Sequence, residues 1–315
     1  MKNLIEDKKS SIPIDWLNEM AKNNLRWLID FSEMKYNDEI HVIANDIVYD
    51  RKLFVLLAGP SSSGKTTTSH KISDELAKRG KQSVYMSLDD FFIDRDKTPK
   101  LPDGQYDFEN FNILDLDAFN RCINELINEH ETELPIFDFV TGTRKKETKH
   151  LKVSKDHVII IEGIHALNPA LIRMNTDFFY KIYICVYTNF IINQQSKIPA
   201  KLLRFMRRMI RDLQTRGASI EHTVNMWNNV CAGEEKYIKP YRNTADHMFD
   251  TTHPYELLLY SKYLTPLLEK EQDLPYAKEL YDKLQFCDKI TEDKIPPNSL
   301  LWEFMVKDVD IEKLY

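Results

Sequence analysis

A short glycine- and serine-rich segment holds the residues of this chain that are most clearly arranged for chemistry. Glycines at positions 59 and 64 let the backbone curl so that successive N–H groups point inward at anionic oxygens. A helix beginning at Lys65 would add the positive end of its dipole. The spacing fits GxxxxGK[ST] and predicts a loop for nucleotide phosphates. Its residues are Gly59, Pro60, Ser61, Ser62, Ser63, Gly64, Lys65, Thr66 and Thr67.

Within this loop, two side chains have distinct expected roles. Lys65 brings a full charge to the β- and γ-phosphates of ATP and is a candidate catalytic cation. The hydroxyl of Thr66 can ligate Mg²⁺, which would accompany the nucleotide. The sequence therefore predicts ATP and Mg²⁺ as cofactors.

Two acidic sites follow strand-like segments and could complete the site. Asp89 and Asp90 follow residues 82–88, and Glu162 follows a run of β-branched residues. Ligands of open α/β sheets bind at the carboxyl ends of strands. We expect Glu162 to ligate the metal and Asp89 to act as general base toward a hydroxyl nucleophile. Asp90 is the alternative base, although adjacent strand residues face opposite ways, which favours a helix-capping or loop role.

Four arginines share one face of a predicted helix. Arg204, Arg207, Arg208 and Arg211 recur at i, i+3, i+4 and i+7, and Arg216 follows. Guanidiniums so close together repel one another unless an anion joins them. We therefore predict a helical lid in which Arg204 binds ATP phosphates, and Arg207 and Arg211 stabilise the charge of the transferred group. A solvated face or an RNA-binding strip is the alternative.

The elements that must position these residues alternate between strand and helix. Alternation of this kind predicts βαβ units and an α/β fold of the P-loop NTPase type, a doubly wound parallel sheet with helices on both faces. Continuous apolar runs such as KLFVLLA suit strands buried on both faces. The expected strands are 52–58, 82–88, 157–162, 181–187 and 247–250, and the clearest helices are 65–79 and 116–129.

Three regions are expected along the chain. Residues 1–50 form an N-terminal helical extension, with a second helix over 38–48. Residues 51–268 form the phosphate-binding domain, with the lid at about 196–220. Residues 269–315 form a C-terminal extension packed on that domain. The Pro-, Gly- and Asp-rich segment between Asp94 and Asn110 is expected to be a functional loop.

Composition excludes several classes of protein. The 315 residues carry a net charge of −6, so no basic field favours nucleic acid. The charged start MKNLIEDKKS is not a secretory signal, and no apolar run is long enough to span a bilayer. The four cysteines include no CxxC motif, which favours a reduced, cytoplasmic setting. A small-molecule partner is expected, nucleic acid and membranes are not, and a homo-oligomer remains open.

Taken together, the motifs resemble the uridine kinase / phosphoribulokinase family of P-loop kinases, closest to a bacterial uridine-kinase-like subgroup. The resemblance covers roughly residues 50–265 in the family's order. The matching segments are GPSSSGKTT at 59–67, SLDDFF at 87–92, YDFENF at 106–111, PIFDFVTGTR at 135–144, IIIEGIHALNP at 159–169, RRMIRDLQTRG at 207–217 and NTADHMFD at 243–250.

The resemblance also implies an acceptor site. Glu109 stands where uridine kinases place an Asp that holds ribose hydroxyls, and Tyr106, Phe137 and Arg144 fall in the substrate-side motifs. One departure concerns the base. The Tyr and His with which uridine kinases read a pyrimidine are here Phe137 and Gly142. A site that reads hydrogen bonds loses discrimination when those partners are lost.

Three functions follow as hypotheses. The first is an ATP-dependent uridine or cytidine kinase. The second is a kinase of another hydroxyl metabolite, such as a sugar phosphate or a different nucleoside, which Gly142 favours. The third is an RNA-associated NTP-binding module that uses the arginine face, against which Asp89 and Glu162 argue because a pure binder needs no base.

Overall fold

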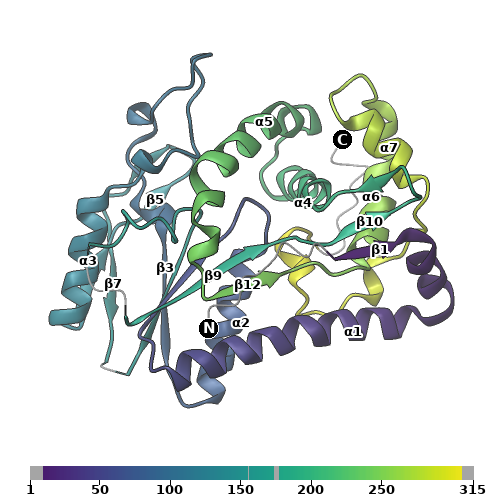
Figure 1. Cartoon of the computed structure of the whole chain (residues 1–315). Helices are drawn as coiled ribbons and strands as arrows, with labels where there is room; N and C mark the ends of the chain where they lie inside the picture. Colours follow the sequence, from purple (N-terminus) through teal and green to yellow (C-terminus); the bar gives the residue numbers. More distant parts are fainter. Residues whose placement is uncertain (1–9, 155, 174–176, 307–315) are drawn as a thin grey trace.

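A five-stranded sheet forms the centre of the computed structural model, which describes residues 10–154, 156–173 and 177–306. Its strand order is β12-β9-β2-β8-β3, and each neighbouring pair is parallel (Figure 1). The predicted parallel α/β sheet is thereby confirmed. The strands are β2 (Phe54–Ala58), β3 (Ser83–Ser87), β8 (Val158–Glu162), β9 (Phe179–Cys185) and β12 (His247–Asp250).

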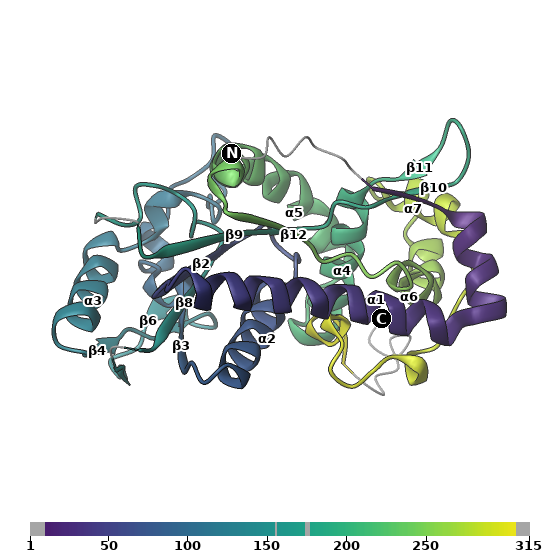
Figure 2. The same cartoon turned by 60° about the horizontal axis from the view of Figure 1, so that its bottom comes forward.

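Both faces of the sheet are buried, because side chains alternate between two hydrophobic clusters. Val55 and Leu57 of β2 belong to one cluster and Leu56 to the other. The first cluster includes residues of α1 and α2, which lie together in Figure 2, and the second includes α3. Burial on both faces explains why β2 and residues 158–161 of β8 are apolar at every position rather than at alternate positions. These helices are α1 (Ile14–Tyr49), α2 (Lys65–Lys78) and α3 (Leu116–Asn128).

The N-terminal region differs from expectation in its division into helices. α1 runs for 36 residues, and its one break in helical geometry lies at Asn24 (φ −146°, ψ 37°). A separate helix over 38–48 is therefore wrong, since the helix continues through that stretch. Apolar positions such as Ile29, Ile40 and Ile47 bury one face of α1 against the first cluster. This packing holds the long helix against the domain.

Four α-helices lie in the described part of the C-terminal half. They are α4 (Ala200–Thr215), α5 (Ile220–Gly233), α6 (Glu256–Lys270) and α7 (Ala277–Leu284). α4 packs against α5 and α6, and α7 packs against α6. No helix of the described residues is long and apolar enough to cross a membrane.

Small strand pairings outside the central sheet were missed by the sequence analysis. β4 pairs with β7, β5 with β6 and β10 with β11, all antiparallel, while β1 runs parallel to β10. Each has two to four residues, too few for an alternating pattern to stand out. They are β1 (Ser11–Pro13), β4 (Glu131–Leu134), β5 (Phe137–Asp138), β6 (Thr143–Arg144), β7 (Lys149–Lys152), β10 (Asn189–Ile191) and β11 (Lys197–Ile198).

A buried polar network joins α1 and the segment around Ser299 to the start of α6. Glu33 of α1 accepts a hydrogen bond of 2.6 Å from the Tyr255 hydroxyl, which lies 2.9 Å from Ser299 Oγ. Burial raises the pKa of Glu33, but interactions with His253, Ser299 and Tyr255 outweigh it and lower the pKa to about 2. The folded protein therefore favours the ionised carboxylate.

This shift makes part of the stability depend on pH. A pKa lowered from 4.5 to about 2 corresponds to about 3 kcal/mol, present above pH 4.5 and lost as pH falls toward 2. We expect Glu33→Gln to reduce the free energy of unfolding at pH 7 by about that amount. The variant should also lose less stability than the wild type between pH 4.5 and 2. Denaturant unfolding at a series of pH values measures both, and parallel pH curves for the two proteins would contradict the assignment.

Candidate active site

The phosphate loop leaves the carboxyl end of β2 and enters α2. A Cβ on Gly59 would clash with the carbonyl oxygen of Ile184 in β9, so only glycine fits there. Gly64 caps α2 with φ +90°, and Ser62 also has a positive φ of 59°. These conformations curl the loop so that the first N–H groups of α2 face outward from its N-terminus.

The loop's side chains fit a phosphate-bearing ligand. The hydroxyls of Ser62 and Ser63 are buried and have no hydrogen-bond partner among the described residues. The Lys65 ammonium lies 3.3 Å from the carbonyl oxygen of Pro60, at the opposite end of the loop. Buried hydroxyls are normally hydrogen-bonded, so these unpaired donors are suited to anionic oxygens.

Glu162 ends β8 beside the loop. It pairs in register with Leu57 of β2 and Ser87 of β3, which places it between the phosphate loop and the acids after β3. Its Oε1 accepts hydrogen bonds from the Tyr85 hydroxyl (2.7 Å) and from Ser87 Oγ (3.1 Å). Sequence reasoning missed Tyr85 and Ser87, although strand alternation puts both on one face of β3. They orient the carboxylate.

Asp89 follows β3 in a short 3₁₀ turn, Leu88–Phe91. Its backbone N–H donates to Ser87 Oγ at 3.3 Å, which starts the turn. Burial raises the pKa of Asp89 to about 7, the negative charge of Glu162 adds to this rise, and Lys65 opposes it. Glu162 and Lys65 thus both act on Asp89, as expected for groups sharing a site.

Glu109 reaches the same site from the long loop between β3 and α3. It is packed so tightly against Gly233 of α5 that a Cβ on Gly233 would clash with its side chain. Its Oε2 is buried and has no hydrogen-bond partner among the described residues. Burial raises its pKa to about 7, against the opposing charges of Arg208 and Lys65.

The arginines of α4 divide into two pairs, and the first pair differs from the expected lid. Arg207 is fully buried and donates twice to Glu256 of α6, at 2.7 Å each. Arg204 pairs with buried Glu234 and donates to the carbonyl oxygen of Ser61 at 3.1 Å. Both therefore brace the phosphate loop from within the protein and do not form a lid over it. Helical periodicity located the shared face but could not indicate the carboxylates that meet it.

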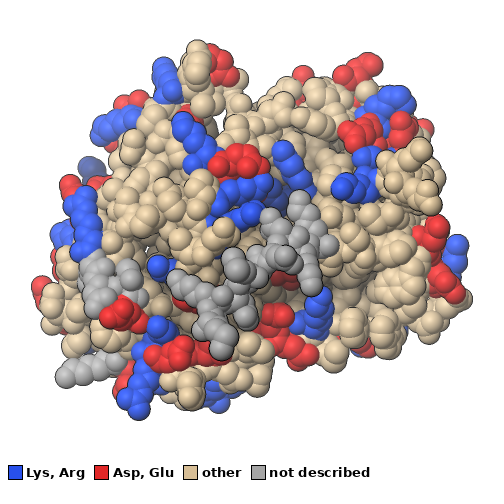
Figure 3. Space-filling view, in the orientation of Figure 1, with Lys and Arg blue, Asp and Glu red and all other residues tan. Residues whose placement is uncertain are grey.

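The second pair of arginines is only partly buried. Arg208 donates to Ser61 Oγ at 2.9 Å and lies 3.2 Å from Asp212. Arg211 lies 2.9 Å from the same Asp212. Because Arg208 touches the loop and also acts on Glu109, it belongs to the site although it was not among the predicted catalytic residues. In the space-filling view, basic and acidic side chains lie side by side near the centre of the face shown (Figure 3).

Two of the residues predicted to bind the acceptor, Phe137 and Arg144, make contacts that stabilise the surrounding chain. Phe137 is buried and its ring contacts those of Phe92 and Phe139, at centroid distances of 5.6 and 5.2 Å. Arg144 pairs with Asp115 at 2.8 Å and donates to the carbonyl oxygens of residues 91 and 92. Its donors are thus engaged in holding the chain after β3.

The other acceptor-side positions lie in loops. Tyr106 forms an isolated bridge with Lys100, whose ammonium lies over the tyrosine ring at 5.4 Å. Gly142 has φ +71°, and a Cβ there would lie 2.7 Å from the guanidinium of Arg95. Arg95 thus occupies the space beside Gly142, and a larger residue at this position would have to displace it. Asp90 accepts a hydrogen bond of 3.4 Å from the Phe137 N–H, a loop role like the one expected.

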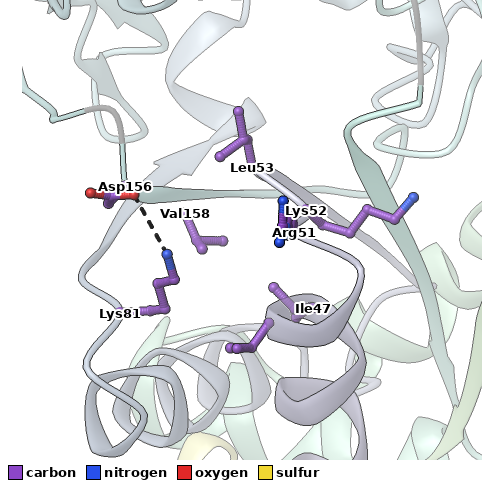
Figure 4. Close-up of a pocket in the computed structure, with 8 residues that line it drawn as sticks. Ile47, Arg51, Lys52, Leu53, Lys81, Asp156 and Val158 are labelled. Atoms are coloured by element: carbon purple, nitrogen blue, oxygen red, sulfur yellow. Dashed lines mark ion pairs between the residues drawn. The ribbon is translucent and has the colours of Figure 1, made fainter.

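Metal ligands are few. Among the described residues no three His, Cys, Asp or Glu side chains gather into a group able to hold a metal ion. The donor set of Thr66 and Glu162 instead suits Mg²⁺, which is held by one or two protein oxygens together with phosphates and waters. A separate cavity of about 390 Å³, lined by Arg51, Lys52 and Lys81, lies at the start of β2, away from the phosphate loop (Figure 4).

Comparison with known proteins agrees with this geometry. A model of the "Phosphoribulokinase / Uridine kinase family" matches residues 54–255. The chain belongs to this family. Uridine kinase from Lactobacillus helveticus is 27% identical over 198 residues, 62% of this chain and 85% of the relative. Uridine kinase from Staphylococcus haemolyticus is 29% identical over 191 residues, 60% and 83% of the two chains.

A solved structure is also similar. It is described as a possible uridine kinase from Bacillus stearothermophilus and aligns with 68% of this chain and 98% of its own, at 21% identity and a TM-score of 0.46. The predicted family is confirmed by the family match, and with it the enzyme class, an ATP-dependent kinase acting on a hydroxyl group.

The bracing role of Arg207 predicts a stability effect. Glu256→Gln leaves the guanidinium charged in a dry site, so we expect the free energy of unfolding to fall by about 3–5 kcal/mol. Denaturant unfolding measures this, and Glu221→Gln, an exposed change of the same kind in α5, should have little effect. Unchanged stability combined with lost phosphotransfer would instead mean that Arg207 acts on the substrate.

Proposed function

We propose that this kinase transfers the γ-phosphoryl group of ATP·Mg²⁺ to a hydroxyl of a nucleoside-like molecule. The observation that carries the proposal is that Asp89 and Glu109 both interact with Lys65 of the phosphate loop, and that Glu162, at the end of β8, acts on Asp89. A loop that only bound nucleotide would not need two carboxylates with pKa values near 7 beside it. The supply of ATP makes the cytoplasm the compartment in which we expect it to act.

The residues have separable roles in this reaction. The loop N–H groups and Lys65 bind the phosphates, and Thr66 and Glu162 hold Mg²⁺, which neutralises phosphate charge when bound. Asp89 accepts the proton of the attacking hydroxyl while the hydroxyl oxygen forms a bond to the γ-phosphorus. The bond from that phosphorus to the β,γ-bridging oxygen breaks, and ADP leaves. A base with a pKa near 7 is well matched to this task at neutral pH.

The contacts available to Glu109 indicate the class of acceptor. The unpaired Oε2 of Glu109 is available to accept hydrogen bonds from vicinal hydroxyls, as a ribose would offer. The relatives named uridine kinase support a nucleoside. The guanidinium of Arg95 lies beside Gly142. Because a guanidinium binds anionic groups well, it favours a second candidate acceptor that carries such a group, for example a sugar phosphate.

An acceptor screen tests the proposal directly. Purified protein with ATP·Mg²⁺ is incubated with nucleosides and with sugar phosphates, and the phosphorylated products are identified by mass spectrometry. We expect one hydroxyl compound to give stoichiometric product and ADP. A product from uridine or cytidine supports the first candidate, and one from a phosphorylated sugar the second. ATP hydrolysis without a phosphorylated product from any compound would refute the proposed transfer.

The role of Asp89 predicts a selective loss. Asp89→Asn should lower kcat by about 10²- to 10⁴-fold, the usual contribution of a positioned base. The affinity for ATP should not fall, because the substitution removes a negative charge near the phosphates. Steady-state kinetics with the acceptor found in the screen and calorimetric titration with ATP measure the two quantities.

The pH profile is the control for this assignment. Since the base works only when deprotonated, wild-type kcat/KM should fall about tenfold per pH unit below a pKa of about 7. The residual kcat/KM of Asp89→Asn should not show this fall below pH 7. Loss of ATP binding in the variant, or a wild-type rate that is flat from pH 5.5 to 8, would show that Asp89 is not the base.

A further inference from the structure

The C-terminal chain packs against the start of the phosphate-loop helix. In both views the yellow segment passes beside α2 (Figure 1, Figure 2). A 3₁₀ turn, Leu300–Glu303, lies here, and a Cβ on Gly64 would be 2.8 Å from Leu300 Cδ1. The ring of Phe304 lies under the guanidinium of Arg207 at 4.8 Å. The turn is therefore part of the wall around the phosphate loop.

One contact reaches a group that the nucleotide also needs. Glu303 Oε2 accepts a hydrogen bond of 2.8 Å from the backbone N–H of Thr67. The first N–H groups of a helix have no partner within it, whereas the Thr68 N–H already bonds to the Gly64 carbonyl oxygen at 3.1 Å. The Thr67 N–H is therefore the last N–H of α2 that has no partner within the helix, and the Glu303 carboxylate accepts its hydrogen bond.

The same place is suited to phosphate on independent grounds. The buried hydroxyls of Ser62 and Ser63 in the adjoining loop have no partner among the described residues. The dipole of α2 and the Lys65 ammonium attract anions there. A phosphate oxygen directed at Thr67 would meet the Glu303 carboxylate, and two anions at one N–H repel each other. Occupation by one therefore opposes occupation by the other.

We propose that Glu303 is an internal competitor of the nucleotide, and that its carboxylate must leave the Thr67 N–H when the phosphates of ATP or ADP bind. The proposal rests on the proposed function in one respect, namely that the loop is the nucleotide site. The C-terminal turn thereby sets the affinity of the donor site from a region outside the family match, which ends at residue 255.

The structure allows the carboxylate to leave while the turn stays in place. Leu300 and Phe304 are fully buried and anchor the segment, as does the hydrogen bond between the Ser299 and Tyr255 hydroxyls. Glu303 itself is only partly buried. Rotation of one side chain is thus sufficient, and the phosphates replace it at the helix N-terminus.

The test is nucleotide affinity without any acceptor. Glu303→Gln keeps the shape and an oxygen acceptor but removes the charge, and Glu303→Ala removes the competitor altogether. Isothermal titration calorimetry with ADP and with ATP, each with Mg²⁺, should show about five- to tenfold tighter binding in both variants, as expected for removing one partly screened like charge. Glu279→Gln, an exposed change in α7 that breaks a pair with Lys283, is the matched control and should bind like the wild type.

The outcomes separate this proposal from the proposed function. Unchanged affinity in both variants would overturn it, and weaker affinity would overturn it by showing that Glu303 supports the donor site. Thermal unfolding checks that the variants are folded. If the side-chain oxygen of the Glu303→Gln variant still accepts the hydrogen bond from the Thr67 N–H, the affinity of Glu303→Ala decides the outcome. Tighter binding with no phosphorylated product in the acceptor screen would leave the competitor role intact and refute only the proposed phosphoryl transfer.

Discussion

The ion pair between Arg207 and Glu256 is the interaction on which the phosphate site depends. Both groups are fully buried, and Arg207 also donates to the carbonyl oxygen of Thr251 at 2.8 Å and to that of Ser62 at 3.4 Å. The Thr251 hydroxyl in turn donates to the carbonyl oxygen of Ser63 at 2.7 Å. The pair thus joins α4 and α6 to the back of the loop. A loop whose N–H groups must face a ligand needs its carbonyl oxygens held on the other side.

The front of the site is governed by a different constraint, an excess of carboxylates. Asp89 and Glu109 both interact with Lys65, Glu162 lies close enough to act on Asp89, and burial makes the charges of Asp89 and Glu109 harder to maintain. The result is two acids with pKa values near 7, suited to exchange protons at neutral pH. Added cationic charge, from Mg²⁺ or from a guanidinium such as that of Arg208, would relieve the repulsion. Under the proposed function, donor binding and acceptor activation would therefore be linked through the same charges.

The predicted acceptor side lies within the family match, and the C-terminal turn lies beyond it. Phe137 and Arg144 stabilise the chain around the acceptor side, and Arg95 fills the space beside Gly142. Glu303 comes from beyond the matched region and still reaches the first turn of α2. The phosphate loop and the acids at the strand ends lie within the family match, whereas Glu303 lies beyond it.

The sequence by itself determined the sheet, the phosphate loop and the acids at the strand ends. Those features depend on local spacing and on burial of both faces of a strand, which leave a pattern in consecutive residues. Only the tertiary structure decided which arginines of α4 are buried, because their partners Glu234 and Glu256 come from other elements. The same holds for Glu303 and Thr67, which are 236 positions apart. Contacts of this kind are set by packing, and no periodicity in the chain encodes them.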